Sequence, residues 1–269
     1  MPIYRLTAGL ASDHLAPTRV VIATLVGLAV EQGYIDGVDQ SVLDFFSDRE
    51  IDRLSAEKEA ITVEHLLTMT SGLDCEKFED RISQSDDWVQ IILDLPMEDE
   101  PGTVFGECNA NTHLLSAILQ QVTGVNAFAY AQTALFEPLG IEVATWRSDP
   151  LGVSLGWQGL EMDPSETAKI GLLYLRDGVW ENQRLLSKDW VRSSLPAMTH
   201  SGYGGLGYQW QEGLVGIYAA GDGRGQWIVL EPEKDVIFVF TAGQREQDAL
   251  SMRILLDAFL IESMHPSPL

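Results

Sequence analysis

The sequence predicts an α+β fold, in which helices fill the first two thirds of the chain and an antiparallel run of strands lies near its end. Two observations indicate this arrangement. Residues 20–30 are apolar except for Thr24 and Gly27, which leaves no polar side and predicts a helix buried on all sides. From Leu206 onward, short apolar runs alternate with Gly, Asp and Pro turns, which is the spacing of a strand meander.

The buried helix is predicted within residues 16–33. Pro17 suits its first turn, because a missing N–H costs nothing there, and Gly33 suits its end. The apolar run is shorter than the roughly 20 residues that cross a bilayer, and the Glu31-Gln32 pair after it does not fit a signal peptide. The chain as it stands is therefore expected in the cytoplasm, although a full-length relative could be exported.

The other elements follow from local patterns. Thr62 is expected to cap a helix that Gly72 ends, Pro96 to stop the next helix, and Pro164 and Ser187 to begin two later helices. The expected helices are 61–73, 87–95, 111–123, 127–136, 164–176, 187–195 and 247–263, with a short amphipathic segment at 39–46. The expected strands are 206–211, 214–219, 226–231 and 236–241, with a turn or hairpin at 180–186 and irregular structure at 143–161. Residues 1–15 are expected to be a leader without clear structure.

Composition limits the partners of the protein. Forty acidic residues against seventeen basic ones give a formal net charge of −23, which repels nucleic acid and anionic lipid surfaces. Cys75 and Cys108 are too few for a disulfide framework, so we expect two unpaired thiols. The five histidines never have the i, i+4 spacing of a helical zinc site. We therefore expect no metal, no cofactor, no nucleic-acid partner and no membrane span.

Several patterns occur in an order that resembles one enzyme family. They are LVGLAVEQGYI and VLDFF, then EHLLTMTSGL, then PGTVF with LLSAILQQVTG, then ETAKIGLLYLRDGVW, and then AAGDGRGQWIVLEPEKDVIFVF. From about residue 20 to residue 263 the chain resembles the penicillin-recognising serine hydrolases, which include class C-type β-lactamases, DD-peptidases and related esterases and amidases. The resemblance implies a β-lactamase/transpeptidase-like fold, with an antiparallel sheet flanked by helices and an all-helical lobe, in one domain over residues 16–269.

The resemblance also implies where the active site lies. In this family a Ser-x-x-Lys motif opens the core helix, a Tyr-x-Asn loop faces it, and a Lys/His-x-Gly strand lines the oxyanion side. Counting back from the LVG pattern puts Ala16 at the serine position and Arg19 at the lysine position. Glu107 then replaces the tyrosine, and Asn109 keeps the clamping amide.

These replacements predict an inactive or very weak hydrolase of esters, amides or β-lactams, because alanine has no nucleophile and arginine is too basic to accept a proton. The third motif becomes Ala219-Ala220-Gly221, and we expect Ala219, Gly221 and Asp222 to contact the ligand. The alternative is a non-catalytic protein that keeps the family pocket for a small ligand or a peptide. We also expect Arg19 to pair with Glu107 within about 4 Å, preferably through two bonds, and so to plug the pocket floor.

Three other residues could supply a nucleophile. Ser154 matches Gly-x-Ser-x-Gly, but no strand precedes it and no helix follows directly, so we interpret the match as chance. Ser71 lies in a stretch that the resemblance treats as structural. Cys108, with His113 five residues later, stays as a third hypothesis if the two side chains meet, against the simpler interpretation of a partly buried thiol beside a surface histidine.

The leader of residues 1–15 is shorter than the leader of the family that the chain resembles. The family normally has some tens of residues before the nucleophile, which supply strands that complete the sheet. We therefore expect a chain truncated at its N-terminus, with an edge or part of a face of the sheet left uncovered. Such a surface recruits partners or other copies of the chain, so self-association is expected there.

Overall fold

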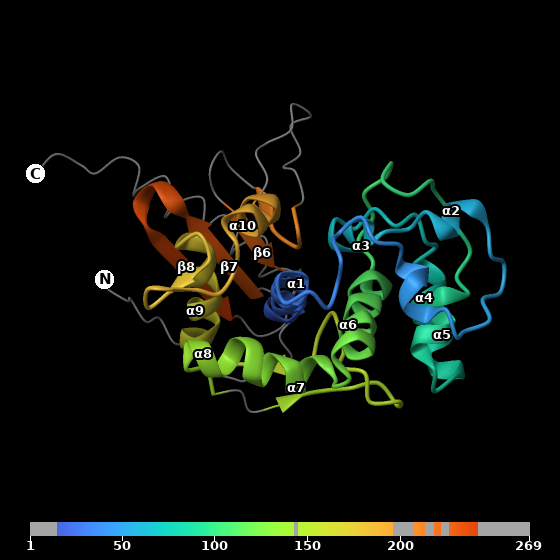
Figure 1. The fold of residues 1–269 in the computed structure, drawn as a ribbon, viewed down its shortest axis with the longest axis horizontal. Coiled ribbons are helices and arrows are strands. Elements are labelled where there is room, and N and C mark those ends of the chain that lie inside the picture. The colour runs from blue at the N-terminus through green and yellow to red at the C-terminus, as the bar shows by residue number, and fades with distance from the viewer. Residues whose placement is uncertain (1–14, 143–144, 196–206, 213–217, 222–225, 242–269) are drawn as a thin grey trace, which may run out of the picture.

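A computed structural model describes residues 15–142, 145–195, 207–212, 218–221 and 226–241. At its centre lies the helix α1 (Leu15–Glu31), which contacts the helices α6 and α7 and also the strands β6 and β7. Most of its apolar side chains from Val20 to Ala29 are fully inaccessible to solvent. The predicted helix buried on all sides is confirmed, and Figure 1 shows it between the sheet and the helix α6.

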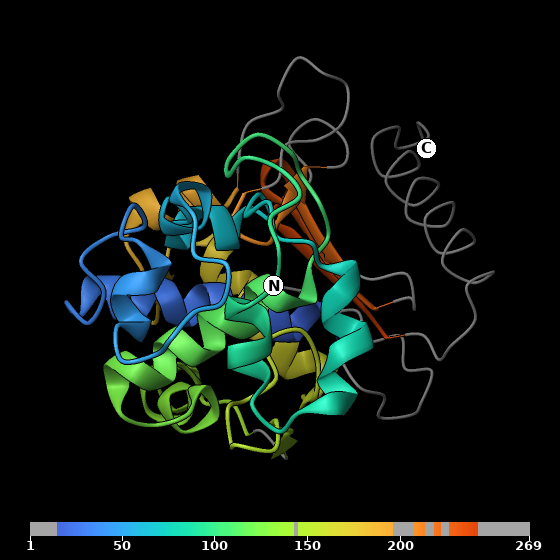
Figure 2. The same ribbon diagram turned by 90° about the vertical axis from the view of Figure 1, so that its right-hand side faces the viewer.

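Most helices of the described residues lie on one side of α1. Figure 2 views the molecule from that side, with these helices in front of the sheet. They are α2 (Ala56–Glu59), α3 (Val63–Leu67), α4 (Glu76–Arg81), α5 (Trp88–Leu93) and α6 (Asn109–Thr123), with 3-10 turns at Val42–Phe46 and Ile82–Gln84. The helices α7 (Ala127–Ala131) and α8 (Glu137–Leu139), joined by a π-helical segment at Gln132–Phe136, run below α1 toward the sheet side in Figure 1. The helices α9 (Pro164–Leu175) and α10 (Lys188–Ser194) belong to the sheet side.

The predicted helix starts are largely confirmed, whereas one helix is much shorter than expected. Thr62 caps α3 in a capping box with His65, and Ser187 caps α10 through the Trp190 N–H. The predicted helix 61–73, however, ends at Leu67, because Met69 has φ of +57° in the left-handed region. The residues after Met69 instead form a loop that lines the candidate site.

The main sheet is antiparallel, with the order β5-β6-β7-β8. Its strands are β5 (Gln211–Glu212), β6 (Tyr218–Gly221), β7 (Gln226–Glu231) and β8 (Val236–Thr241). The strands β7 and β8 have the predicted bounds. The strand expected at 206–211 is not formed over 207–210. The strand expected at 214–219 is replaced by β6, which runs four residues and ends at Gly221. A short ribbon pairs β1 (Thr145–Trp146) with β2 (Leu160–Glu161), so this region is more regular than predicted. A second ribbon pairs β3 (Val179–Trp180) with β4 (Gln183–Arg184), which confirms the hairpin expected at 180–186. Residues 1–14 and the predicted helix 247–263 lie outside the described residues, and Leu15 already begins α1.

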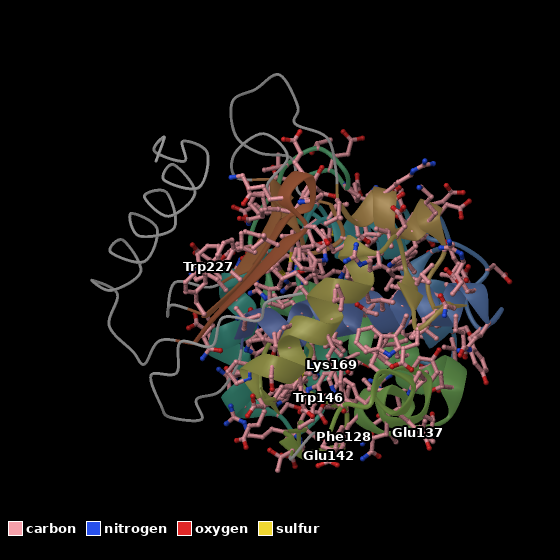
Figure 3. The ribbon with its side chains drawn as sticks, turned by 90° about the vertical axis from the view of Figure 1, so that its left-hand side faces the viewer. Phe128, Glu137, Glu142, Trp146, Lys169 and Trp227 are labelled. Atoms are coloured by element: carbon pink, nitrogen blue, oxygen red, sulfur yellow. A yellow bond between two sulfur atoms is a disulfide. The ribbon has the colours of Figure 1, made fainter. Side chains whose placement is uncertain are left out.

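The two faces of the sheet differ. One face packs against α1 and α9, and Gly171 of α9 lies close to Ile228, Leu230 and Ile237. The other face carries a separate apolar cluster around Val229, and Figure 3 shows Trp227 on the side of the sheet away from α9. We call this cluster the outer face; it consists of Ala219, Trp227, Val229, Phe238 and Phe240.

The helices α1 and α10 meet at a glycine. A side chain at Gly27 would overlap the indole ring of Trp190, whose nearest atoms lie 2.5–2.7 Å from an added Cβ. The glycine therefore allows the two helices to approach. Among the described residues, no helix is both long enough and apolar enough to cross a membrane.

Candidate active site

The first turns of α1 hold two of the predicted site positions. Ala16 and Arg19 are three residues apart, which places them on one face of the helix. The Arg19 guanidinium donates from Nη2 to Oδ1 of Asn109 at 2.7 Å, and its Nη1 lies 3.7 Å from Oε1 of Glu107. The fold thus brings together Arg19, Glu107 and Asn109, although 90 positions separate Arg19 from Asn109.

The predicted contact between Arg19 and Glu107 is confirmed, but its predicted role as a buried plug is wrong. The side chain of Arg19 is 19% exposed, whereas that of Glu107 is 66% exposed. The carboxylate therefore lies at the rim of the site, where water screens the pair. The shorter bond of Arg19 goes to Asn109, which fixes the guanidinium against the start of α6.

A disulfide between Cys75 and Cys108 holds the segment that carries Glu107 and leads into Asn109 at the start of α6. The two Cα atoms are 5.6 Å apart, within the range that a disulfide requires. The expectation of two unpaired thiols is therefore wrong. The sequence could not reveal the pair, because the cysteines are 33 positions apart and no spacing rule connects two isolated cysteines.

The disulfide also removes Cys108 as a nucleophile, because it leaves no thiol. His113, its proposed partner, points elsewhere: its Nε2 lies 3.2 Å from Oδ2 of Asp149, and its ring packs against Trp88 and Trp157. Both His113 and Asp149 are buried. Asp149 accepts backbone N–H bonds from residues 151 and 153 at 2.9 Å, so this pair organises a turn.

The two serines considered from the sequence also have structural partners. The Ser71 hydroxyl is buried and donates to Oδ1 of Asn111 at 2.7 Å, and an amide oxygen is not a general base. Ser154 is fully buried, and its Oγ accepts the N–H of Phe128 at 3.2 Å. No strand or helix element directly flanks Ser154, as expected for a chance motif match.

Two cavities meet at Arg19 and Glu107. The smaller, of about 20 Å³, lies between α1 and the sheet, and the larger, of about 550 Å³, extends toward α4. The smaller is lined by Arg19, Met69, Phe105, Glu107, Gln209, Gln211, Ala220 and Gly221. The larger is lined by Arg19, Met69, Ser71, Gly72, Leu73, Cys75, Glu76, Phe78, Asp80, Glu98, Asp99, Val104, Gly106, Glu107, Cys108 and Asn109.

The strand β6 faces the smaller cavity with a different alanine from the one that we expected. Ala220 and Gly221 line the cavity, whereas Ala219 belongs to the outer face, where it packs near Val229. Successive side chains of a strand point to opposite faces, so a one-residue error in the motif moves the contact to the wrong side. Asp222 lies outside the described residues.

Sequence reasoning missed Gln209 and Gln211 as lining residues. Gln209 Nε2 donates to the Leu67 carbonyl at 2.7 Å, across 142 positions, and Tyr208 donates to Oε1 of Glu64 at 3.2 Å. Burial and the nearby Glu64 carboxylate raise the pKa of Tyr208 to about 12. These tertiary bonds tie the segment to α3. By contrast, Met69 and Phe105 lie within two of the patterns that carried the family resemblance.

Comparisons with known proteins agree with this architecture. A sequence model of the family described as Beta-lactamase matches residues 18–259. A 6-aminohexanoate-dimer hydrolase of Paenarthrobacter ureafaciens is 30% identical over an alignment of 176 residues, and the match covers 57% of this chain and 44% of that protein. This chain therefore spans less than half the length of that curated relative.

Solved structures show the same fold at low sequence identity. A candidate 6-aminohexanoate-dimer hydrolase from Bacillus anthracis superposes with a TM-score of 0.79 at 13% identity, covering 96% of this chain and 74% of that chain. An octameric penicillin-binding protein homologue from Pyrococcus abyssi superposes with a TM-score of 0.67 at 19% identity, covering 92% and 66%. The predicted β-lactamase/transpeptidase-like fold is confirmed.

Proposed function

The chain belongs to the beta-lactamase family, and on that premise we propose that it binds an ester, amide or β-lactam acyl group but hydrolyses it very slowly or not at all. The contact of Arg19 with both Asn109 and Glu107 is the observation that carries this proposal. It supports the alignment of Arg19 with the family's lysine. Ala16, three residues earlier, then stands at the nucleophile position.

The chemistry of these residues explains why turnover through position 16 is not expected. A methyl group cannot attack an acyl carbon, and a guanidinium stays protonated, so it cannot take the proton of a nucleophile. The Asn109 amide remains to orient a substrate. The site therefore keeps a polar clamp without a nucleophile and its base.

Restoring the family residues tests this assignment. The triple variant Ala16→Ser/Arg19→Lys/Glu107→Tyr should hydrolyse an activated ester faster than any of the single variants, because nucleophile and base act as a unit. The matched control is Arg19→Lys/Glu107→Tyr, which reshapes the same pocket without a nucleophile and should stay inactive. Intact-mass spectrometry with a reactive ester and a β-lactam should find an acyl adduct at position 16 in the triple variant alone. An equal rate from Ala16→Ser alone, or an adduct on the unaltered protein, would contradict the assigned roles.

The alternative function is non-catalytic binding of a small acyl ligand or a peptide. The cavity of about 550 Å³ favours it, since small-molecule sites commonly have volumes of about 300–1,000 Å³. The name of the curated relative suggests linear amides as first probes. A ligand that binds only the folded state raises the melting temperature, so a concentration-dependent rise without product formation would support binding without turnover.

Compartment and assembly form a second part of the proposal. The Cys75–Cys108 disulfide favours an oxidising compartment over the cytoplasm that we first expected. We retain the proposal that the sheet supports self-association, now assigned to its outer face. The octameric description of the Pyrococcus abyssi homologue motivates the test. Sedimentation velocity over a concentration series should show assembly that Phe238→Ser weakens, and a strictly monomeric protein would exclude it.

A further inference from the structure

The two cavities of the candidate site share three lining residues, namely Arg19, Met69 and Glu107. Arg19 and Glu107 face each other as an ion pair. Met69 is therefore the apolar member of the junction between the cavities. A ligand that extends from the larger cavity toward β6 has to pass the Met69 side chain.

The backbone of Met69 is unusual for a residue that carries a side chain. Its φ is +57°, in the left-handed region, where a Cβ atom crowds the following carbonyl oxygen and glycine is favoured. Non-glycine residues in this region are held there by their surroundings, and they cluster at ligand sites. Met69 is also only 3% exposed. The left-handed turn thus places a buried methionine where the two cavities meet.

Hydrogen bonds fix this methionine at its backbone and at its sulfur atom. The Met69 carbonyl accepts the N–H of Gly106 at 3.0 Å. Asn111, which is fully buried, donates from Nδ2 to the Met69 Sδ at 3.7 Å, and its Oδ1 accepts the Ser71 hydroxyl. A methionine side chain is ordinarily flexible. The bond to the sulfur restrains it, so the side chain presents a defined shape to a ligand.

The space on the two sides of Met69 is very unequal. The smaller cavity has a volume of about 20 Å³, which is room for about one water molecule, whereas the larger has about 550 Å³. The Gln209 amide, which lines the smaller cavity, donates to the Leu67 carbonyl at 2.7 Å and so ties this lining to the residues just before Met69. A group that enters the smaller cavity must therefore be narrow, while the rest of the ligand has room.

We propose that Met69 is a specificity-determining residue, which limits the ligand to acyl groups that are unbranched at the carbon next to the carbonyl. The carbonyl end lies beside Arg19 and enters the smaller cavity, the neighbouring carbon lies against Met69, and the remaining chain occupies the larger cavity. Two methyl groups on that carbon overlap the methionine side chain. The inference rests on the proposed function and narrows its ligand class. It requires binding but no chemical step.

Two isomeric probes test this size limit on the full chain. N-ethylpentanamide has an unbranched acyl chain, whereas N-ethyl-2,2-dimethylpropanamide has the same atoms with two methyl branches next to the carbonyl. In ligand-observed NMR titrations the straight isomer should bind about tenfold or more tightly, because a steric clash rejects the branched one. The equal composition of the probes excludes mass and charge as causes.

Substitutions at Met69 identify the residue that imposes the limit. Met69→Gly removes the side chain and suits the left-handed backbone, so the variant should fold. It should bind the branched isomer severalfold more tightly than the unaltered protein does, and so bring the two affinities close together. Met69→Ala should act in the same direction, and it keeps the proposal testable if the glycine variant does not fold.

Two controls match these variants. Met69→Leu keeps a bulky apolar side chain at the same position and should keep the preference for the straight isomer. Met97→Ala removes a methionine that packs near Gly72 but is not part of the described lining of either cavity, and it should also keep the preference. Thermal unfolding of each variant shows whether it is folded.

The outcomes separate this inference from the proposed function. Equal binding of both isomers to the unaltered protein overturns the size limit, and so does a preference that persists in Met69→Gly and Met69→Ala. An equal loss of preference in Met97→Ala also overturns it, because a general loss of packing would then be the cause. In each of these cases acyl binding stands. If neither isomer binds to the unaltered protein or to Met69→Gly, the ligand-binding role of the pocket fails as well.

Discussion

Reducing the Cys75–Cys108 disulfide should destabilise the protein by an amount that the chain separation sets. The bond closes a loop across 33 positions, and a cross-link of that span lowers the conformational entropy of the unfolded chain by an equivalent of about 4 kcal/mol at 25 °C. Reduction, or the double variant Cys75→Ala/Cys108→Ala, should therefore lower the free energy of unfolding by roughly 2–4 kcal/mol. Because Cys108 lies between Glu107 and Asn109, ligand-induced stabilisation should fall as well.

Urea unfolding with and without dithiothreitol measures this loss, and thiol titration of the unfolded protein counts the free cysteines. The double variant is the control, because a reducing agent should not change its unfolding. Two free thiols in unreduced protein would show that the bond does not form. A fully oxidised protein whose stability does not respond to reduction would instead refute the loop-entropy argument.

Three further perturbations test contacts elsewhere in the fold. Folding raises the pKa of Tyr208 to about 12, so the protonated tyrosine contributes stability that is complete below about pH 10 and is lost between about pH 10 and 12, roughly 2–3 kcal/mol in all. Tyr208→Phe, which cannot bond Glu64, should lack this alkaline loss when unfolding is followed by denaturant titration at several pH values, and parallel profiles would contradict it. Gly27→Ala should cost about 1–3 kcal/mol through overlap with the Trp190 ring, and a smaller Trp190→Phe ring should recover part of that cost in a double-mutant cycle. Asp149→Ala, which leaves buried donors without their acceptor, should lower the free energy of unfolding by about 3 kcal/mol or more, whereas Asp149→Asn should cost less because it keeps one acceptor oxygen.

Local interactions explain which parts of the fold could be predicted from the sequence. The Thr62 and Ser187 caps each satisfy an N–H three residues away, so neighbouring residues decide them. The same holds for Pro164 at the start of α9 and for the strands β7 and β8, whose bounds match the prediction. The helix α1 was predictable because a helix that is apolar on all sides is stable only when it is buried.

The ordered patterns of the sequence also located part of the candidate site. They align Arg19, Glu107 and Asn109 with the family's motif positions, and the structure brings the three side chains into contact. The alignment fixed positions along the chain but not their surroundings. It could not show that the Glu107 carboxylate is 66% exposed, because exposure depends on every segment that packs nearby.

Only the tertiary structure decided the remaining features. The pairing of Cys75 with Cys108 depends on how distant segments pack. The choice of Ala220 over Ala219 as the residue that faces the cavity depends on the register of one short strand. The left-handed turn at Met69 ends α3 before Gly72, where the local pattern placed the helix end, and the loop that follows lines the larger cavity. The sequence by itself determined most of the helices, the last two strands and the family of this protein, since the causes of these elements lie within a few residues. The lining, charge and covalent closure of its pocket arise from contacts between segments far apart in the chain, which no local pattern encodes.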